Sequence, residues 1–181
     1  MKNQPHSLIS FLIGTILLFC LISFPLSGCK NNSVSPSDNE LSKEKYFNSP
    51  EELAKAVFAA LQTKNSQQLK SLVPTNKELQ DWFDREETSD KDAISKQEEL
   101  LKASNKLLNE DAQEMYDEMQ TAGIKNVKIK EITHEVMDKY FYKEADIYIM
   151  LDNNCKIKLT DCVKTDKGWV FIRKANFIKP E

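Results

Sequence analysis

The chain has 181 residues, of which 40% are hydrophobic and 29% charged, and its formal net charge is -3. This length suits one domain with a single core. Acidic and basic residues are interspersed and nearly balanced, which excludes the strongly basic surface that nucleic-acid-binding domains present.

The amino terminus has the pattern of a secretory signal peptide. An apolar run from Leu8 to Leu26 follows a short segment that carries Lys2. The run ends in Leu26-Ser27-Gly28-Cys29, which resembles the lipobox of bacterial lipoproteins: an aliphatic residue, two small residues and a cysteine. The resemblance implies cleavage after Gly28, attachment of diacylglycerol to the thiol of Cys29, and acylation of the new amino terminus.

An uncleaved membrane anchor is the alternative for this run, because 19 apolar residues just span a bilayer. It is disfavoured by interruptions at Ser10, Gly14, Ser23 and Pro25. The lipobox implies an exported protein that is lipid-anchored to the bacterial membrane. Lys30 stands where an aspartate often signals inner-membrane retention, which favours the outer membrane in a host with two membranes.

Removal of the signal peptide, residues 1–28, leaves 153 residues with a formal charge near -4. Residues 29–47 are mostly polar, contain one proline and show no apolar periodicity, so we expect a lipidated flexible tether. Such a coil holds the domain roughly 20 to 25 Å from the lipid. Residues 48–181 then form a single folded domain.

Three short helices are expected at the start of this domain. Ser49 and Glu52 have capping-box spacing ahead of an apolar helical repeat, and a second helix runs from about Ser66 to Val73. Thr75 and Glu78 form another capping box before a third helix.

A longer helical segment is expected over residues 92–122. Asn109-Glu110-Asp111 is polar on every face and predicts a bend or a break. Gly123 has the position of a left-handed C-cap, with Ile124 folding back against the helix. The expected buried stripe comprises Ile94, Leu101, Leu108, Met115 and Ala122, widened by Leu100, Leu107, Ala112 and Met119.

After Gly123 the apolar period becomes that of strands. Residues 127 and 129, then 132, 134 and 136, alternate in opposite phases, which predicts a bulge near Lys130-Glu131. Further strands are expected at Ala145–Leu151, Cys155–Leu159 and Trp169–Arg173, joined by turns at residues 152–154 and 165–168. Trp169 is predicted to be an anchor of the core.

These elements predict an α+β fold in which N-terminal helices pack on a curved C-terminal antiparallel sheet of about four strands. Ser49-Pro-Glu-Glu-Leu53 and the pair Lys156-Ile-Lys-Leu159 and Lys167-Gly-Trp-Val-Phe171 are similar to stretches in small bacterial lipoproteins of unassigned function. The arrangement resembles the cone of the nuclear-transport-factor-like, or cystatin-like, superfamily. That resemblance implies a fold and leaves the activity open.

Only Cys155 and Cys162 remain in the folded part. On one extended strand their Cα atoms are about 23 Å apart, whereas a disulfide needs about 7 Å or less. We expect two separate thiols.

Several sites are excluded by missing residues. Gly123 and Gly168 are the only glycines left after cleavage, and both serve turns, so no glycine-rich phosphate loop is possible. His134 is the only remaining histidine, which excludes an ordinary zinc site and a Ser-His-Asp hydrolase with a Gly-x-Ser-x-Gly elbow. No metal or cofactor is expected.

Three function classes remain. The leading hypothesis is a non-enzymatic, tethered module whose concave face binds a small hydrophobic ligand, lipid or peptide. The second is a structural lipoprotein with a filled core that binds an envelope protein. The third is a small enzyme of the ketosteroid-isomerase kind, an activity known in the superfamily.

His134 and Asp161 are the candidate site residues, because each occupies a strand position otherwise held by aliphatic side chains. If both face the concave side, they are a candidate acid–base pair, with Tyr148 or Tyr142 as hydrogen-bond donors. Alternatively, a bulge near Thr160 turns Asp161 to solvent, and His134 is structural.

Overall fold

The computed structural model describes residues 45–86 and 88–179, which form one α+β unit. Its helices are α1 (Pro50–Gln62), α2 (Ser66–Ser71), α3 (Asn76–Phe83), α4 (Lys91–Lys106), the π-helical turn η1 (Leu107–Asp111), α5 (Ala112–Thr121) and the 3-10 turn η2 (Ile124–Asn126). Its strands are β1 (Ile129–Lys139), β2 (Tyr142–Leu151), β3 (Lys156–Thr165), β4 (Gly168–Val170) and β5 (Asn176–Ile178). The predicted α+β class is confirmed, whereas the lipobox, the cleavage site and tether residues 30–44 lie outside the described residues.

Local capping chemistry fixes the starts of α1 and α3. The hydroxyl of Ser49 accepts a hydrogen bond from the backbone N–H of Glu52, as predicted, and the Glu52 carboxylate accepts from the N–H of Asn48. Thr75 and Glu78 form the complete capping box that their spacing predicts. These bonds satisfy N–H groups that have no partner inside a helix.

The break expected at Asn109-Glu110-Asp111 is a π-helical turn, η1, between α4 and α5. A π turn adds one residue to the helical repeat. The buried positions therefore step from Leu100 in α4 through Leu107 in η1 to Ala112 in α5. Ile94, expected in the buried stripe, is exposed, because the phase of α4 turns Ala93 inward in its place.

The sheet is antiparallel in the order β1-β2-β3-β4, and β5 also pairs with β3. The bulge predicted near Lys130-Glu131 is confirmed by the register shift between Ile129 and Glu131. A second bulge places Thr160 and Asp161 opposite a single residue of β2. The continuous fourth strand expected at residues 169–173 is wrong: β4 and β5 pair with β3 on either side of this bulge.

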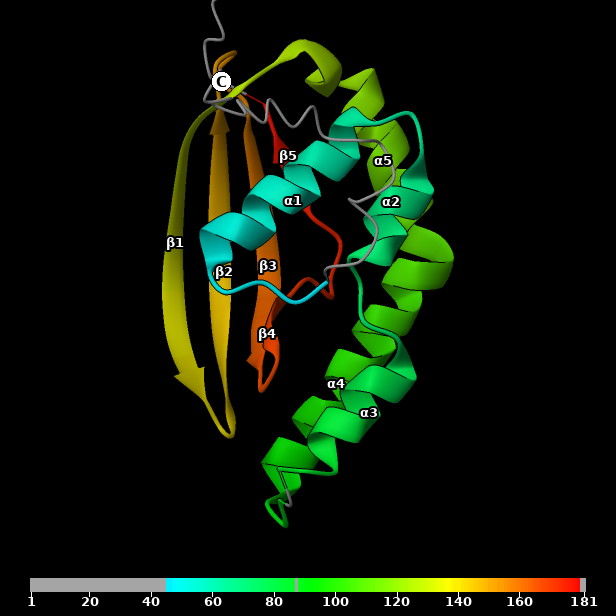
Figure 1. Ribbon diagram of the computed structural model, residues 1–181, viewed down its shortest axis with the longest axis vertical. Coiled ribbons are helices and arrows are strands. Elements are labelled where there is room, and N and C mark those ends of the chain that lie inside the picture. The colour runs from blue at the N-terminus through cyan, green and yellow to red at the C-terminus, as the bar shows by residue number, and fades with distance from the viewer. Residues whose placement is uncertain (1–44, 87, 180–181) are drawn as a thin grey trace, which may run out of the picture. The chain divides into compact units, whose positions relative to one another are not determined.

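Figure 1 shows α1 lying across one face of the sheet, and the side chains of that face are packed. Ile147, Ile149, Ile157 and Leu159 are fully buried there and join one apolar cluster with Leu53, Leu61, Met115, Met119 and Phe171. A second cluster unites α3 and α4 with Tyr142, Val163, Val170 and Ile172. Cys162 belongs to the first cluster and Val163 to the second. Because adjacent residues of a strand point to opposite faces, the two clusters lie on opposite sides of β3.

The last residues assigned to the tether belong to the folded unit. Phe47 is buried and forms a β-bridge with Trp169, with backbone N···O distances of 2.8 and 3.0 Å. A Cβ on Gly168 would lie 2.7 Å from the carbonyl oxygen of Phe47, so this close approach requires glycine. The domain therefore begins by residue 45, earlier than the predicted boundary at 48.

Both thiols are free, as predicted, and both are buried. Burial raises the pKa of the Cys162 thiol well above its ordinary value, which keeps it protonated and unreactive. None of the helices among residues 45–86 and 88–179 has the length and apolar character needed to span a membrane.

Trp169 is 4% exposed, so its predicted place in the core is confirmed. We expect Trp169→Ala to lower the free energy of unfolding by about 3 to 5 kcal/mol, because a large aromatic side chain leaves a cavity. Urea unfolding measures the change, and Tyr140→Ala, at a 64% exposed position, is the control. Similar small losses in both variants would contradict this assignment.

Candidate functional site

His134 lies near the middle of β1, opposite Ile147 of β2. Its Nδ1 is 3.1 Å from Oε1 of Glu51 in the first turn of α1. The histidine therefore links the edge strand to the start of α1.

Asp161 occupies the β3 bulge with φ +51°, in the left-handed region that aspartate tolerates better than most residues. Its carboxylate contacts Nε of Arg173, and its side chain is 13% exposed. Two strand spacings, about 10 Å, separate β1 from β3. The structure thus places His134 and Asp161 on different partners and does not assemble them into an acid–base pair.

Tyr148 lies in a third place, apart from the contacts of His134 and Asp161. The amino groups of Lys156 and Lys158 lie 5.5 and 5.2 Å from the centroid of its ring. These lysines alternate with the buried Ile157, so they occupy the face of β3 opposite the helix-covered core. His134, Tyr148 and Asp161 consequently do not form the single pocket expected from the sequence.

Behind α4, Asp161 belongs to a charged network. Arg173 bridges Asp161 and Glu99, with 2.6 Å between its Nη2 and Oε1 of Glu99. The neighbouring Glu144 is buried and accepts a hydrogen bond from the hydroxyl of Tyr142 at 3.2 Å. Burial, and then the charge of Asp161, raise the pKa of Glu144. Burial, and then Glu144, raise the pKa of Tyr142.

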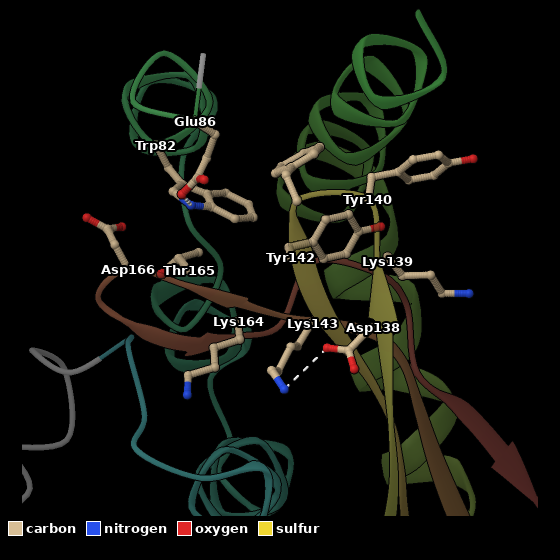
Figure 2. A pocket seen from close by; sticks show the side chains of 11 residues that line it. Trp82, Glu86, Asp138, Lys139, Tyr140, Tyr142, Lys143, Lys164, Thr165 and Asp166 are labelled. Carbon is tan, nitrogen blue, oxygen red and sulfur yellow. Dashed lines mark hydrogen bonds and ion pairs between the residues drawn. The ribbon is translucent and has the colours of Figure 1, made fainter. Parts of the chain in front are cut away.

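Beside this network, a surface cleft of about 460 Å³ opens between α3, the β1–β2 hairpin and the β3–β4 turn. We call it the aromatic–lysine cleft (Figure 2). Its lining consists of Trp82, Glu86, Asp138, Lys139, Tyr140, Phe141, Tyr142, Lys143, Lys164, Thr165 and Asp166. Its volume falls within the range of small-molecule sites.

Local interactions hold the three walls of the cleft in place. The capping box at Thr75 sets the start of α3 and hence the position of Trp82. An ion pair of 2.9 Å between Arg85 and Asp166 joins the end of α3 to the β3–β4 turn. Within that turn, the hydroxyl of Thr165 donates to the carbonyl oxygen of Gly168 at 3.0 Å.

Aromatic side chains from two distant segments meet at one wall of the cleft. The ring centroid of Phe141 lies 5.7 Å from that of Trp82 and 5.9 Å from that of Phe83. Tyr142 is 5.0 Å from Phe141 and 6.2 Å from Trp82. These distances are typical of packed aromatic pairs, so the wall is rigid.

Positive charge gathers beside this wall. Lys143 and Lys164 are directly opposite each other on β2 and β3, and Figure 2 shows their amino groups on the same side of the cleft. Like charges at such positions destabilise a sheet. Asp138 balances Lys143 at 3.2 Å. Within residues 45–86 and 88–179, however, neither Lys164 nor Lys139 has a carboxylate at ion-pair distance.

The acidic residues of the cleft already have partners in the chain. Glu86 accepts from Nε1 of Trp82 at 3.1 Å, Asp138 pairs with Lys143, and Asp166 pairs with Arg85. The polar capacity left for a ligand is therefore mainly cationic.

Two other clefts offer less to a ligand. A groove of about 980 Å³ along α5 is lined by Glu110, Glu114, Asp117 and Glu118, and has Phe177 as its one aromatic residue. A cleft of about 600 Å³ contains Arg173 and Lys174, both of which pair with glutamates. Neither combines an aromatic wall with lysines that lack ion-pair partners.

Of the residues that line the cleft, only Tyr142 is among the candidates predicted from the sequence, where it is expected as a hydrogen-bond donor. The signal of the cleft is the run Lys139-Tyr-Phe-Tyr-Lys143, in which two lysines flank three consecutive aromatic residues at a hairpin. Trp82 and Lys164 carry no such local signal, because the fold alone brings them to this hairpin. Comparisons of the chain with protein-family models, with curated proteins and with solved structures find no match.

The raised pKa of Glu144 predicts a dependence of stability on pH. Because its pKa is higher in the folded than in the unfolded state, the contribution of Glu144 to stability is largest below pH about 4.3 and is lost as pH rises through the folded-state pKa. Glu144→Gln keeps an acceptor for Tyr142 and removes the charge. We expect a higher melting temperature than wild type at pH 7 and no difference at pH 4.

Thermal unfolding between pH 4 and pH 8 measures this effect. The exposed Glu98 of α4 provides the control, Glu98→Gln. A gain of equal size at both ends of the pH range would show that ionisation of Glu144 is not its cause.

Proposed function

We propose that this chain is an exported bacterial lipoprotein, anchored through Cys29, whose folded domain is a binding module. Its ligand is a small anion that carries an aromatic ring, and it binds in the aromatic–lysine cleft. The observation that carries the proposal is the like-charged pair Lys143 and Lys164 beside an aromatic wall.

The repulsion between Lys143 and Lys164 lowers the stability of the sheet. Only one of the two lysines has a carboxylate partner within the described chain. An anionic group near Lys143 and Lys164 relieves the repulsion between them, and a ring packs against Phe141 and Tyr142. Since the rings already contact one another, little side-chain freedom is lost on binding.

A second candidate is the structural lipoprotein that binds an envelope protein. It is favoured by the packed helix-covered face, where Ile147, Ile149 and Leu159 are fully buried instead of lining a pocket. The isomerase alternative has the least support, because His134 and Asp161 bind separate partners.

The cleft is tested with 8-anilinonaphthalene-1-sulfonate, a fluorescent aromatic anion. We expect it to bind the folded protein and to quench the emission of Trp82 by energy transfer. Lys164→Gln weakens binding about tenfold, as loss of a charge-assisted contact does. A Trp82→Phe variant separates the signal of Trp82 from that of Trp169.

The control is Lys125→Gln, at an exposed lysine of η2 outside the cleft. Thermal unfolding is measured for each variant, because the probe also binds partly unfolded protein. Equal affinity in wild type and Lys164→Gln, or an equal loss in the control, would place the probe elsewhere and contradict the proposal.

The anchor is tested independently. Cys29 supplies the only thiol in the lipobox, so we expect Cys29→Ala to leave an uncleaved precursor that incorporates no labelled fatty acid. Mass spectrometry of the mature amino terminus and partitioning into detergent measure the outcome. A mature wild-type protein without lipid, starting at another residue, would overturn the anchor and leave the cleft hypothesis intact.

A further inference from the structure

β1 is the longest strand of the sheet, with 11 residues, and it is an edge strand. It pairs with β2 on one side, and no segment in the described part of the chain pairs with its other side. Figure 1 shows β1 along the outer margin of the sheet. Edge strands that remain unpaired are usually short, charged, bulged or interrupted by proline. β1 carries charged side chains, but after the bulge at Ile129–Glu131 it is long, regular and free of proline.

The hairpin geometry determines which backbone groups face outward. Lys139 and Tyr142 are partners across the two-residue loop, so this pair exchanges backbone hydrogen bonds. Pairs alternate along an antiparallel ladder, and odd-numbered β1 residues therefore bond to β2. The N–H and C=O groups of Ile132, His134, Val136 and Asp138 consequently point to the open edge.

Side chains add an apolar element to this edge. Val136 is 42% exposed and is one of few large apolar residues with that exposure in the described chain. Ile132 lies four residues away on the same face of β1 and is half-buried. An antiparallel strand of suitable sequence would cover both.

We propose that this strand is the β1 of a second copy of the chain, paired antiparallel about a two-fold axis at His134. This centre is the midpoint of β1, so the whole strand overlaps. Each Ile132 then lies opposite Val136 of the second copy, and each Thr133 opposite Glu135. The remaining pairs are Lys130 with Asp138, Glu131 with Met137, and Ile129 with Lys139.

Among the registers that keep most of β1 overlapped, charge complementarity selects this one. The outward backbone N–H and C=O groups belong to even-numbered residues, so the possible registers differ by shifts of two residues along the partner strand. Each such shift moves the two-fold axis by one residue. An axis at Glu135 places Glu135 opposite its own copy, and an axis at Thr133 places Glu131 opposite Glu135. Both arrangements set like charges against each other, whereas the register centred on His134 contains none.

The resulting assembly is closed by its own symmetry, because the same edge is used by both copies. Its sheet runs continuously through both domains. The hairpins point in opposite directions, which leaves the two aromatic–lysine clefts at opposite ends of the paired strands. The pairing therefore does not depend on what the clefts bind.

Cysteine substitution tests the register in the full-length protein. Opposing residues of a hydrogen-bonded antiparallel pair have Cα atoms about 5.5 Å apart, within disulfide range. We expect His134→Cys to form a disulfide-linked dimer when intact cells are treated with the oxidant diamide. Val136→Cys is the matched control: two copies of residue 136 are offset by four residues, about 13 Å, and do not link.

Non-reducing electrophoresis and peptide mapping identify the product. A link between two copies of residue 134 and none in Val136→Cys supports the proposal. No link at residue 134, equal links in both variants, or a link from residue 134 to a different protein overturns it. Wild-type protein controls for the native cysteines.

A second measurement avoids crosslinking altogether. Sedimentation of the detergent-solubilised full-length protein is expected to show a dimer that Val136→Lys weakens about tenfold, because two cross-strand pairs are lost by symmetry. Ile178→Lys, at a 45% exposed position on β5, leaves the dimer unchanged. A monomeric wild-type protein, or equal weakening by both variants, overturns the pairing.

Discussion

The β-bulge at Thr160–Asp161 is the feature on which the rest of the fold depends. One extra residue reverses the phase of β3, so that Cys162 faces the large core under α1 and α5 while Val163 faces the small core under α3 and α4. The bulge also divides the neighbouring strand into β4 and β5. Arg173, in the segment between them, compensates the charge of Asp161.

The aromatic–lysine cleft follows from this second core. Val163, Val170 and Ile172 form an apolar platform on which Leu79, Trp82 and Leu100 pack. Because Tyr142 joins the same cluster, the hairpin is held beside α3. Without the change of phase in β3, Trp82 would have no platform and would not meet the hairpin. The cleft thus forms because helices pack on both sides of the bulged strand β3.

Sequence could predict the features that are local. Ser49 and Thr75 each lie three residues from the N–H group that they cap, and the bulge near Glu131 shows as a change of apolar phase on both sides. The bulge at Asp161 is only one of two alternatives from sequence, because Leu159 and Val163 are both apolar and fit one uninterrupted alternation, although the bulge turns them to opposite faces of the sheet. The side of the sheet that α1 covers, and the meeting of Lys164 with Lys143, depend on distant pairings that leave no trace in local pattern.

Three places in the described chain depart from local rules, and they differ in how each departure is compensated. The left-handed Asp161 has Arg173 against its carboxylate. The opposed lysines of β2 and β3 are only half neutralised, by Asp138. The outward groups of β1 have no pairing strand. A folded chain agrees with its local rules except where a contact elsewhere in the chain, or another molecule, compensates the departure. The first departure is therefore structural, and the other two are the places where binding is expected.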